Sequence, residues 1–368
     1  MLFVNCQLLI SLCMDIIELF DKTIIANASD LHLLVGVAPT LRIDGRLTPL
    51  QAYNPLTSEE IEALVMKILN ESQRESLMTN RVLDFSYAHG GAGFGDKGRF
   101  RVNLYFQKGT LAGAFRLLPP KVKTVEELFL PKICHHFAEL KQGFILVTGP
   151  TGHGKSTTIA AIVNEINMTK AANIITLEDP IEYVYPKGKS IFSQRELGID
   201  THSWAEGLKS MLREDPDVVV IGEMRDPESI ALAITIAETG HLVFSTLHTN
   251  SASQTIDRII DSFPEHQQNQ IRIQLANTLE GVISQRLIPK IDAGRVVAVE
   301  VLLVNSAIKA NIRENKTHLI DSVIETSQDI GMIPLELSLA DLVKQGLVSL
   351  DVARGYALRE KDFLRLVA

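Results

Sequence analysis

Short apolar runs recur through the middle of the chain and predict buried strands. Between residues 143 and 247 they read FILVTG, NIITLE, DVVVIG and HLVFST, and stretches with helical periodicity separate them. Strands that are apolar at nearly every position are typical of parallel sheets whose two faces are covered by helices. The pattern therefore predicts an α/β core.

Residues 14–118 show a mixed pattern of short helices and strands. MDIIELFDKTII has helical spacing, whereas LHLLV and TLRIDGRL read as strands, with Asp44-Gly45 as a hairpin turn. After a glycine-rich loop, GGAGFGDKG, the segment RFRVNLYF alternates polar and apolar residues, which predicts a half-buried strand with Arg99 and Arg101 on one face. Together these segments predict a small α/β domain with an antiparallel sheet.

Two Thr-x-x-Glu patterns predict helix starts. Thr57 and Glu60 open the segment TSEEIEALVMKILN. Thr124 and Glu127 lie in LPPKVKTVEELFLP, which predicts a linker that leads into a short helix. After about residue 300, helical spacing returns in SAIKANIRENKTHLIDSVIE and LELSLADLVKQGLVSLDVARGYAL, which predicts a small helical subdomain.

The composition is that of a globular protein with a sizeable core. Of 368 residues 46% are hydrophobic, and the formal net charge is −8 with a pI near 5.7. This acidic balance gives no electrostatic reason to expect nucleic acid as a partner. Cys6, Cys13 and Cys134 are too few for a disulfide framework and form no CxxC pair, so a reducing cytoplasm is the expected compartment.

The apolar stretch MLFVNCQLLISLC, residues 1–13, differs from a signal peptide. It lacks a basic start and a small-residue cleavage site, and it is too short to span a bilayer. A well-patterned helix begins at Met14. We therefore expect residues 1–13 to be an extension or a misassigned start.

GPTGHGKSTT carries the clearest chemical signal. Gly149-x-x-x-x-Gly154-Lys155-Ser156 fits the P-loop pattern, directly between an apolar strand and an apolar-periodic helix. In such a loop backbone N–H groups and the helix N-terminus face the phosphates of ATP, the lysine reaches the β and γ oxygens, and the serine ligates Mg²⁺. The alternative is a tight strand-to-helix turn. The predicted nucleotide-binding residues are Gly149, Pro150, Thr151, Gly152, His153, Gly154, Lys155, Ser156 and Thr157.

Carboxylates follow two of the predicted strands. In TLEDPIEY, Glu178 and Asp179 end a strand, and in DPDVVVIGEMRD, Glu223 follows Gly222. The carboxyl ends of strands in an α/β sheet share the edge where ligands bind, so these acids could order Mg²⁺ and water. Either acid alone could equally be a helix cap, but both follow one P-loop.

Two histidines flank a predicted strand in AETGHLVFSTLHTNSA. On an extended strand His241 and His248 would point to opposite faces. No third ligand stands at zinc-like spacing, so we do not predict a metalloprotease site. We expect one histidine to contact the γ-phosphate and the other to hold the sheet or a subunit contact.

The order of these motifs is specific. GPTGHGKST, TLEDPIEY, SMLREDPDVVVIGEMRD and AETGHLVFSTLHTNSA look like the Walker A, Asp box, Walker B and His box of the secretion ATPase superfamily. From Met14 onward the chain resembles its pilus retraction ATPases, and AIKANIREN is similar to a segment that this family links to retraction. The resemblance implies a small PAS-like α/β N-terminal domain (14–118), a linker (119–140), a RecA-like P-loop ATPase core (141–300) and a helical C-terminal subdomain (301–368).

The resemblance also implies roles for the acids and for one histidine. Glu178 would be the base that positions the attacking water, and His248 would sense the γ-phosphate. Glu223 would be the Walker B acid, acting on Mg²⁺ through water, while Ser156 binds the metal directly. ATP and Mg²⁺ are thus the implied ligands.

Three arginines match arginines of the family. Arg101 and Arg116 correspond to N-terminal-domain arginines that reach the nucleotide, and Arg213 to one in the SMLRED motif. Arginine suits this task because it stays charged and can bind two phosphate oxygens at once. A solvated strand face is the alternative for any one of them. Lys209 stands where the family often has a further arginine. Lysine keeps the positive charge but lacks the planar guanidinium group that can donate two hydrogen bonds at once.

His153 departs from the serine usual in the family's GPTGSGKST. Because a P-loop offers mainly backbone N–H groups, we expect its side chain to point toward solvent or the neighbouring domain. The expected effect on function is a modest modulation near the histidine pKa at most.

The implied function is a homohexameric, ATP-hydrolysing ring motor that powers pilus retraction and twitching motility. The implied partners are an inner-membrane pilus platform protein and a paralogous retraction ATPase, and the implied location is cytoplasmic, peripheral at the inner membrane. No nucleic-acid partner is expected.

Several alternatives stay open. Within the superfamily they are an ATPase of a type IV secretion or conjugation system and the paralogous retraction ATPase itself. The extension ATPase typically carries a paired-CxxC zinc site, which this sequence does not have. A non-hydrolysing regulator would lack Lys155, Glu178 or Glu223, and a nucleic-acid motor is disfavoured by the acidic balance.

Overall fold

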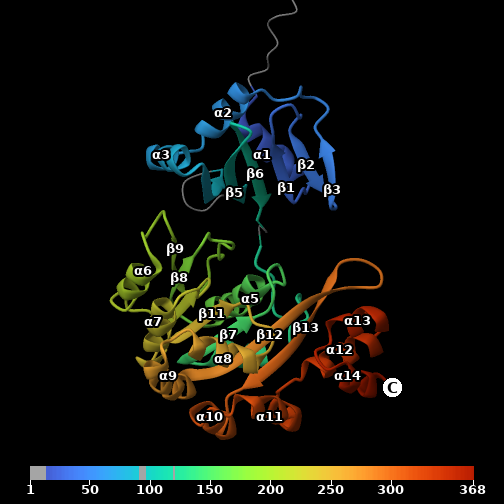
Figure 1. The fold of residues 1–368 in the computed structure, drawn as a ribbon. Coiled ribbons are helices and arrows are strands. Elements are labelled where there is room, and N and C mark those ends of the chain that lie inside the picture. Colours follow the sequence, from blue (N-terminus) through green and yellow to red (C-terminus); the bar gives the residue numbers. More distant parts are fainter. Residues whose placement is uncertain (1–13, 91–96, 119–120) are drawn as a thin grey trace, which may run out of the picture. The chain divides into compact units, whose positions relative to one another are not determined.

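The computed structural model describes residues 14–90, 97–118 and 121–368, which divide into two compact units. The first unit runs to Lys121 and includes residues 182–184, and the second holds the remaining described residues to Ala368. In Figure 1 the chain up to Lys121 is blue to teal, and the residues that follow are green to red. The expected extension at residues 1–13, residues 91–96 of the glycine-rich loop and residues 119–120 of the expected linker lie outside the described residues. The domain limits given above stay a prediction.

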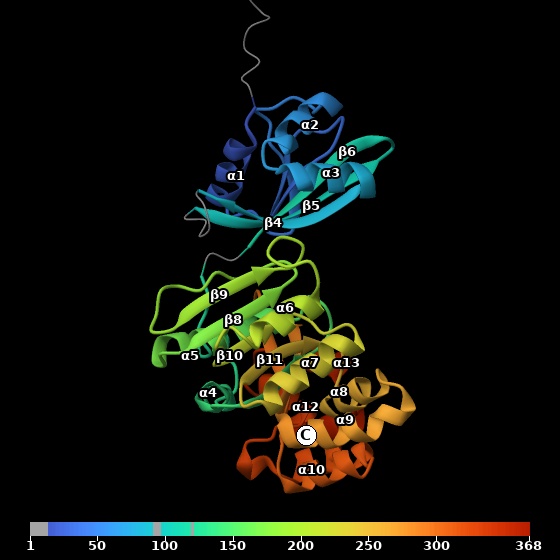
Figure 2. The ribbon, with the colours of Figure 1, turned by 90° about the vertical axis from the view of Figure 1, so that its left-hand side faces the viewer.

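The first unit is an antiparallel sheet with helices packed on one face (Figure 2). Within its described residues the strand order is β3-β2-β1-β6-β5-β4, and all pairs are antiparallel. This confirms the predicted α/β domain. Its elements are α1 (Ile16–Ile25), β1 (Asp30–Leu33), β2 (Thr40–Ile43), β3 (Arg46–Pro49), α2 (Ser58–Met66), α3 (Glu71–Asn80), β4 (Val82–His89), β5 (Gly98–Gln107) and β6 (Thr110–Leu117).

Local sequence signals account for two features of this sheet. Asp44 and Gly45 have φ values of 48° and 79°, the left-handed pair that a tight hairpin between β2 and β3 requires. In β5, buried and part-exposed residues alternate, so that Phe100 and Val102 face the helices while Arg101 lies on the opposite face. The alternation predicted from RFRVNLYF is confirmed.

Only one of the two Thr-x-x-Glu patterns begins a helix. Thr57 and Glu60 form a reciprocal capping box at the start of α2. Thr124 and Glu127 make the same two hydrogen bonds, of 2.8 and 3.2 Å, but they close a turn, and the next helix is α4 (Ile133–Glu139). The predicted helix start at Thr124 is wrong, because Phe129 adopts a left-handed φ of 55° that a continuing helix does not allow.

The second unit is built on a mixed sheet. Its described strands follow the order β13-β12-β7-β11-β10-β8-β9. The four predicted runs form the parallel strands β7 (Gly143–Thr148), β8 (Asn173–Glu178), β10 (Val218–Ile221) and β11 (Leu242–Leu247). The sequence did not predict β9 (Ile191–Glu196), β12 (Leu279–Pro289), which runs parallel to β7, or β13 (Arg295–Leu303), which pairs antiparallel with β12.

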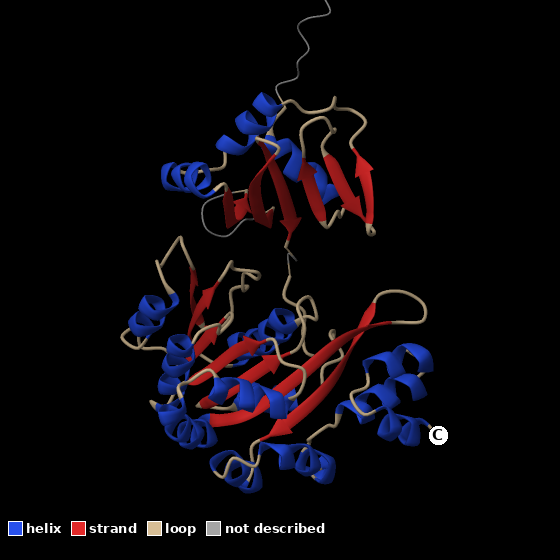
Figure 3. Ribbon diagram, in the orientation of Figure 1, coloured by secondary structure: helices blue, strands red, loops and turns tan. Residues whose placement is uncertain are grey.

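Helices cover both faces of this sheet (Figure 3). α4 and α5 (Lys155–Thr169) share one core with it. A second core contains residues of α6 (Trp204–Met211), α7 (Pro227–Glu238), α8 (Ala252–Asp261), α9 (Glu265–Thr278), α10 (Ser306–Arg313) and α11 (Ile320–Thr326). A third core joins β12 and β13 to α12 (Leu335–Lys344), α13 (Leu350–Tyr356) and α14 (Glu360–Val367). Among the described residues no helix has the length and apolar character needed to cross a membrane.

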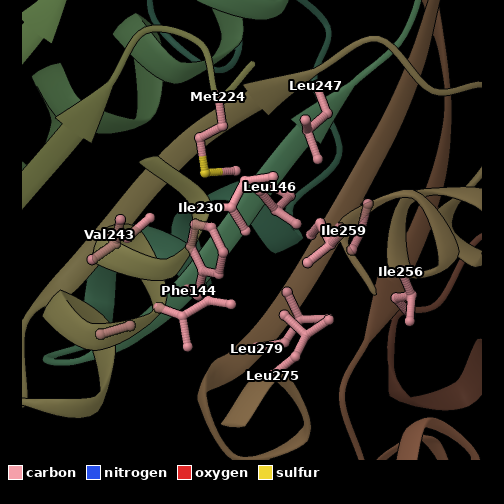
Figure 4. Close-up of a cluster of buried hydrophobic side chains, with 14 of the residues drawn as sticks. Phe144, Leu146, Met224, Ile230, Val243, Leu247, Ile256, Ile259, Leu275 and Leu279 are labelled. Carbon is pink, nitrogen blue, oxygen red and sulfur yellow. The ribbon is translucent and has the colours of Figure 1, made fainter. Parts of the chain in front are cut away.

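The second core fixes the strands that lead into the site. Phe144 and Leu146 of β7 belong to one buried cluster with Val243 of β11 and with Ile256 and other residues of the flanking helices (Figure 4). Each such side chain contributes about 1.5–3 kcal/mol when it is fully buried. The carboxyl ends of β7 and β11, where two functional loops begin, are therefore rigidly placed.

Candidate functional site

The P-loop connects β7 to the first turn of α5. Gly149 has a φ of 140°, and a Cβ at this position would lie 2.4 Å from the Gln285 carbonyl oxygen of β12, so only glycine fits. Gly154 is the N-cap of α5, with a φ of 82°, and brings no side chain to the helix end. The first-turn N–H groups and the helix dipole therefore favour an anion here.

Lys155 lies inside this loop. Lys155 is 8% exposed. Its Nζ donates hydrogen bonds to the carbonyl oxygens of Gly149, at 2.9 Å, and Pro150, at 3.1 Å. Nζ also lies 3.4 Å from Nδ1 of His248. A glycine cradle, a helix N-terminus and an inward-held ammonium group together fit a nucleotide phosphate.

His248 connects the P-loop to the acid that follows β10. Its Nδ1 lies 3.3 Å from Thr151 Oγ1, and its Nε2 lies 3.1 Å from Oε1 of Glu223. The other oxygen of Glu223 accepts a 2.9 Å hydrogen bond from Arg225. Burial alone would raise the Glu223 pKa, but Arg225 and His248 outweigh it and hold the pKa below its usual range. Glu223 is therefore an anion at neutral pH.

Glu178 ends β8, the strand next to β10. Leu177 is in register with Ile221, and a Cβ on Gly222 would lie 3.2 Å from the Glu178 Cα, so the two acidic strand ends are adjacent. Oε1 of Glu178 accepts a 2.8 Å hydrogen bond from Thr176 Oγ1. Glu178 and Glu223 thus share the carboxyl edge of the sheet, as their sequence positions predicted.

The residues present fit magnesium only in company with phosphate. In the part of the chain that the structure describes, no group of three histidine, cysteine, aspartate or glutamate side chains could hold a metal ion. Mg²⁺ in proteins usually takes one or two protein ligands and completes its shell with water and phosphate oxygens. Ser156, in the first turn of α5, and Glu223 are the side chains that suit this arrangement.

The expectation that the His153 side chain points toward solvent or the neighbouring domain is wrong. Its Nδ1 accepts a 3.2 Å hydrogen bond from the backbone N–H of Leu287 on β12. Burial lowers the His153 pKa, and the positive charges of Arg286, Lys155 and Arg295 lower it further. His153 is therefore neutral near pH 7, which is the state that can accept this bond.

Two other predicted contacts lie at the opposite edge of the sheet. His241 precedes β11, and its Nδ1 lies 2.9 Å from the Ile236 carbonyl oxygen at the end of α7. This contact ties the start of β11 to α7, and the role expected for the second histidine stays a prediction. Arg213 follows α6, ahead of the amino end of β10, and is exposed. Within one chain Arg213 is therefore not part of the cluster around Lys155.

The two N-terminal arginines belong to the first unit. Arg101 of β5 and Arg116 of β6 are register partners, so their side chains lie on one face. Arg116 Nε lies 3.0 Å from Asp30 Oδ1, and Arg101 Nη2 lies 3.6 Å from Asp84 Oδ2. Both arginines are thus held in ion pairs within their own unit.

Sequence reasoning missed two residues of this site. Arg225 comes two positions after Glu223 in GEMRD, so its basic side chain in a catalytic motif was a usable signal. Gln285 binds the P-loop from β12, and 132 residues separate it from its partner His153. No local pattern marks such a contact.

Comparison with known proteins shows the family. Residues 130–333 match the family described as type II/IV secretion system protein. The chain is 44% identical over 350 residues to the type IV pilus retraction ATPase PilT of Pseudomonas aeruginosa, covering 95% of this chain and 100% of that protein. It is 43% identical over 341 residues to a twitching motility protein of Neisseria gonorrhoeae, covering 92% of this chain and 90% of that protein.

A solved structure gives the same result. The pilus retraction motor PilT with bound ADP has a TM-score of 0.88 and 46% identity to this chain, and the match covers 96% of this chain and 99% of that one. The chain therefore belongs to the type II/IV secretion system protein family and, within it, to the PilT group of secretion ATPases.

Proposed function

We propose that this protein is an ATP-hydrolysing motor that powers type IV pilus retraction, and with it twitching motility. The observation that carries the proposal is the chain of contacts from Lys155 through His248 to Glu223 at one edge of the second unit's sheet. Full-length similarity to a pilus retraction ATPase supports the assignment to pili.

The substrate of this site is ATP together with Mg²⁺. Residues 149–157 bind its phosphates, with Lys155 as the cation, while Ser156 and, through water, Glu223 contact the metal. When bound, ATP supplies the phosphoanhydride bond that water breaks. A carboxylate oxygen of Glu178 takes the proton of the attacking water, and His248 contacts the γ-phosphate.

The three predicted arginines act in the assembled protein. We expect a homohexameric ring in which nucleotide is held between the N-terminal and C-terminal domains. Arg101 and Arg116 reach the nucleotide from the N-terminal domain, and their charge-assisted hydrogen bonds stabilise the negative charge on its phosphates. Arg213, exposed at the other edge of the sheet, acts between neighbouring subunits.

ATP binding closes the N-terminal domain onto the core, and hydrolysis with product release reopens it in sequence around the ring. These sequential movements rotate the central surface of the ring. The rotating surface turns an inner-membrane pilus platform protein, so that pilin subunits return to the membrane. The motor works on the cytoplasmic side, docked peripherally, and a paralogous retraction ATPase is a further partner.

Complementation tests the proposal. In a strain that lacks its retraction ATPase, the wild-type chain should restore twitching and Lys155→Ala should not.

A second variant probes the AIKANIREN segment. Lys309 and Arg313 lie on the accessible side of α10, whereas Ile308 and Ile312 are fully buried, so Lys309→Ala with Arg313→Ala changes this segment without opening the core. This variant should keep ATP turnover and lose twitching, with Lys316→Ala as the control. A wild-type chain that hydrolyses ATP but never restores twitching would remove the pilus assignment.

A further inference from the structure

β12 runs beside both loops of the site and contacts each of them with a different residue. Its residues pair with β7 up to Thr148, so the next positions of β12 lie beside the start of the P-loop. Side chains alternate between the two faces of a strand, and consecutive residues can therefore reach elements on opposite faces of the sheet. Here Gln285 reaches the P-loop and α5, while Arg286 reaches the loop between β11 and α8.

Gln285 contacts both the P-loop and the first turn of α5. Its side chain is held on both sides, since Nε2 donates a 2.6 Å hydrogen bond to the His153 carbonyl oxygen and Oε1 accepts a 2.8 Å bond from Thr158 Oγ1. Its own carbonyl oxygen occupies the space beside Gly149 where a Cβ would stand. Because Gln285 is 1% exposed and Thr158 is 2% exposed, water cannot readily replace these bonds.

Arg286 binds the loop that carries His248. It is 5% exposed, and its Nη2 donates a 2.7 Å hydrogen bond to the carbonyl oxygen of Asn250, two residues after His248. Nη1 donates to the Gln285 carbonyl oxygen at 3.2 Å. No carboxylate of the described residues forms a salt bridge with Arg286. A buried cation bound to carbonyl oxygens fixes the backbone, since the guanidinium group is planar and rigid.

We propose that Gln285 and Arg286 are positioning residues that lock the P-loop and the His248 loop together. Lys155 and His248 come from different loops, yet their nitrogens lie 3.4 Å apart, and β12 is bonded to both loops. The inference rests on the proposed function for its catalytic meaning, because the pair acts on phosphate only through Lys155 and His248.

Hydrogen exchange of the nucleotide-free protein tests the lock without any turnover. Gln285→Met keeps the length of the side chain and removes both hydrogen bonds, so amide exchange should rise about tenfold in residues 149–158 while the central strands keep their protection. Arg286→Met should raise exchange in residues 248–252 instead, and Arg286→Lys should restore part of the protection. Ser284→Ala is the matched control, because the buried Ser284 hydroxyl has no hydrogen-bond partner among the described residues. Unchanged exchange in both loops, or an equal rise over the whole core, would overturn the proposal.

A double-mutant cycle on ADP binding provides the second readout. Thr158→Val keeps the shape of the side chain and removes the hydroxyl that Gln285 accepts from. Each single variant should weaken Mg-ADP binding about tenfold, and the double variant should bind no more weakly than Gln285→Met alone. Fully additive losses would show that Gln285 does not act through its bond with Thr158 and would contradict the Gln285 side of the lock. If the wild-type chain bound no nucleotide at all, the proposed function would fail, while the exchange experiment would still decide this inference.

Discussion

The lysine of the P-loop and the arginines of the first unit are held in different ways. In the second unit Lys155 is 8% exposed and is bound by two backbone carbonyl oxygens of its own loop. In the first unit the side chain of Arg116 is 67% exposed and pairs with Asp30. Lys155 is held by the backbone of its own loop, whereas the exposed guanidinium group of Arg116 can leave Asp30, which then still has Arg42 at 3.8 Å. The phosphate site is therefore preorganised within one chain, whereas the arginine side chains of the first unit can leave their carboxylate partners and bind another anion.

Lys155→Ala should have the largest effect. Removing the only side-chain cation of the P-loop takes away charge stabilisation where negative charge develops, so ATP turnover should fall by about 1,000-fold. A steady-state phosphate-release assay measures this. Lys189→Ala, which changes an exposed lysine bonded to the Thr169 carbonyl oxygen, should leave turnover unchanged. Wild-type turnover in Lys155→Ala would contradict the site.

Glu178→Gln should come next. Glutamine keeps the size of the side chain and the acceptor for the Thr176 hydroxyl, but it cannot take a proton. Turnover should fall about 100-fold while ATP affinity stays near the wild-type value. Single-turnover kinetics separate the two quantities. A parallel loss of binding and turnover would instead make Glu178 a structural residue of the strand end.

Glu300 extends the comparison to a buried acid. It lies on β13, and its carboxylate accepts a 2.6 Å hydrogen bond from the Ala252 N–H at the start of α8, just after the His248 loop. Burial raises its pKa from 4.5 to about 7; the nearby carboxylates of Asp321 and Glu336 also raise it, and the bond from Ala252 and the charge of Arg359 oppose the rise. Between these two pKa values the folded protein keeps a proton that the unfolded chain has released. Stability should therefore fall as the pH rises through this window.

Glu300→Gln should remove this pH dependence, because glutamine carries the neutral state at every pH. Above pH 7 the variant should be more stable than the wild type by up to roughly 3 kcal/mol, and near pH 4.5 the two should match. Urea unfolding across that range measures the difference. A constant difference at all pH values would show that Glu300 does not titrate in this window.

Arg116→Ala should have the smallest effect on stability. The Arg116 side chain is exposed, and the largely buried Asp30 keeps Arg42 Nε at 3.8 Å and a hydrogen bond from the Ser29 hydroxyl, so the free energy of unfolding should change by no more than about 1 kcal/mol. ATP turnover should nevertheless fall several-fold, since the arginine acts in the assembled motor. Urea unfolding and turnover should be measured on the same preparation. A loss of stability well above 1 kcal/mol would make Arg116 a structural residue and break the comparison.

Local patterns predicted much of the fold. The apolar runs became β7, β8, β10 and β11, Asp44-Gly45 became the hairpin turn, and the glycine spacing became the P-loop. These features depend on a few neighbouring residues, whose conformational preferences can be read directly. The roles given to Glu178, His248 and the arginines stay predictions.

Contacts between distant segments could not be read in the same way. The valine-rich run of β13, RVVAVEVLL, was a usable strand signal that was missed, whereas the pairing of β12 with β7, and with it the bond from Gln285 to His153, joins segments more than 130 residues apart. For this reason the His153 side chain was expected to point away from the core, whereas its Nδ1 accepts from Leu287. The Thr124 pattern failed for a different reason, since the left-handed Phe129 ends the turn. Register between strands decides such contacts, and one sequence does not reveal it.

Equilibrium binding of Mg-ADP tests the central claim most directly. If the second unit alone preorganises the phosphate site, Lys155→Ala should weaken ADP binding at least tenfold, whereas Arg101→Ala combined with Arg116→Ala should weaken it by no more than about threefold. Calorimetric titration of the three proteins under one set of conditions gives the values. An arginine variant that lost as much affinity as Lys155→Ala would contradict the claim, because the arginines would then hold the diphosphate as strongly as the second unit does.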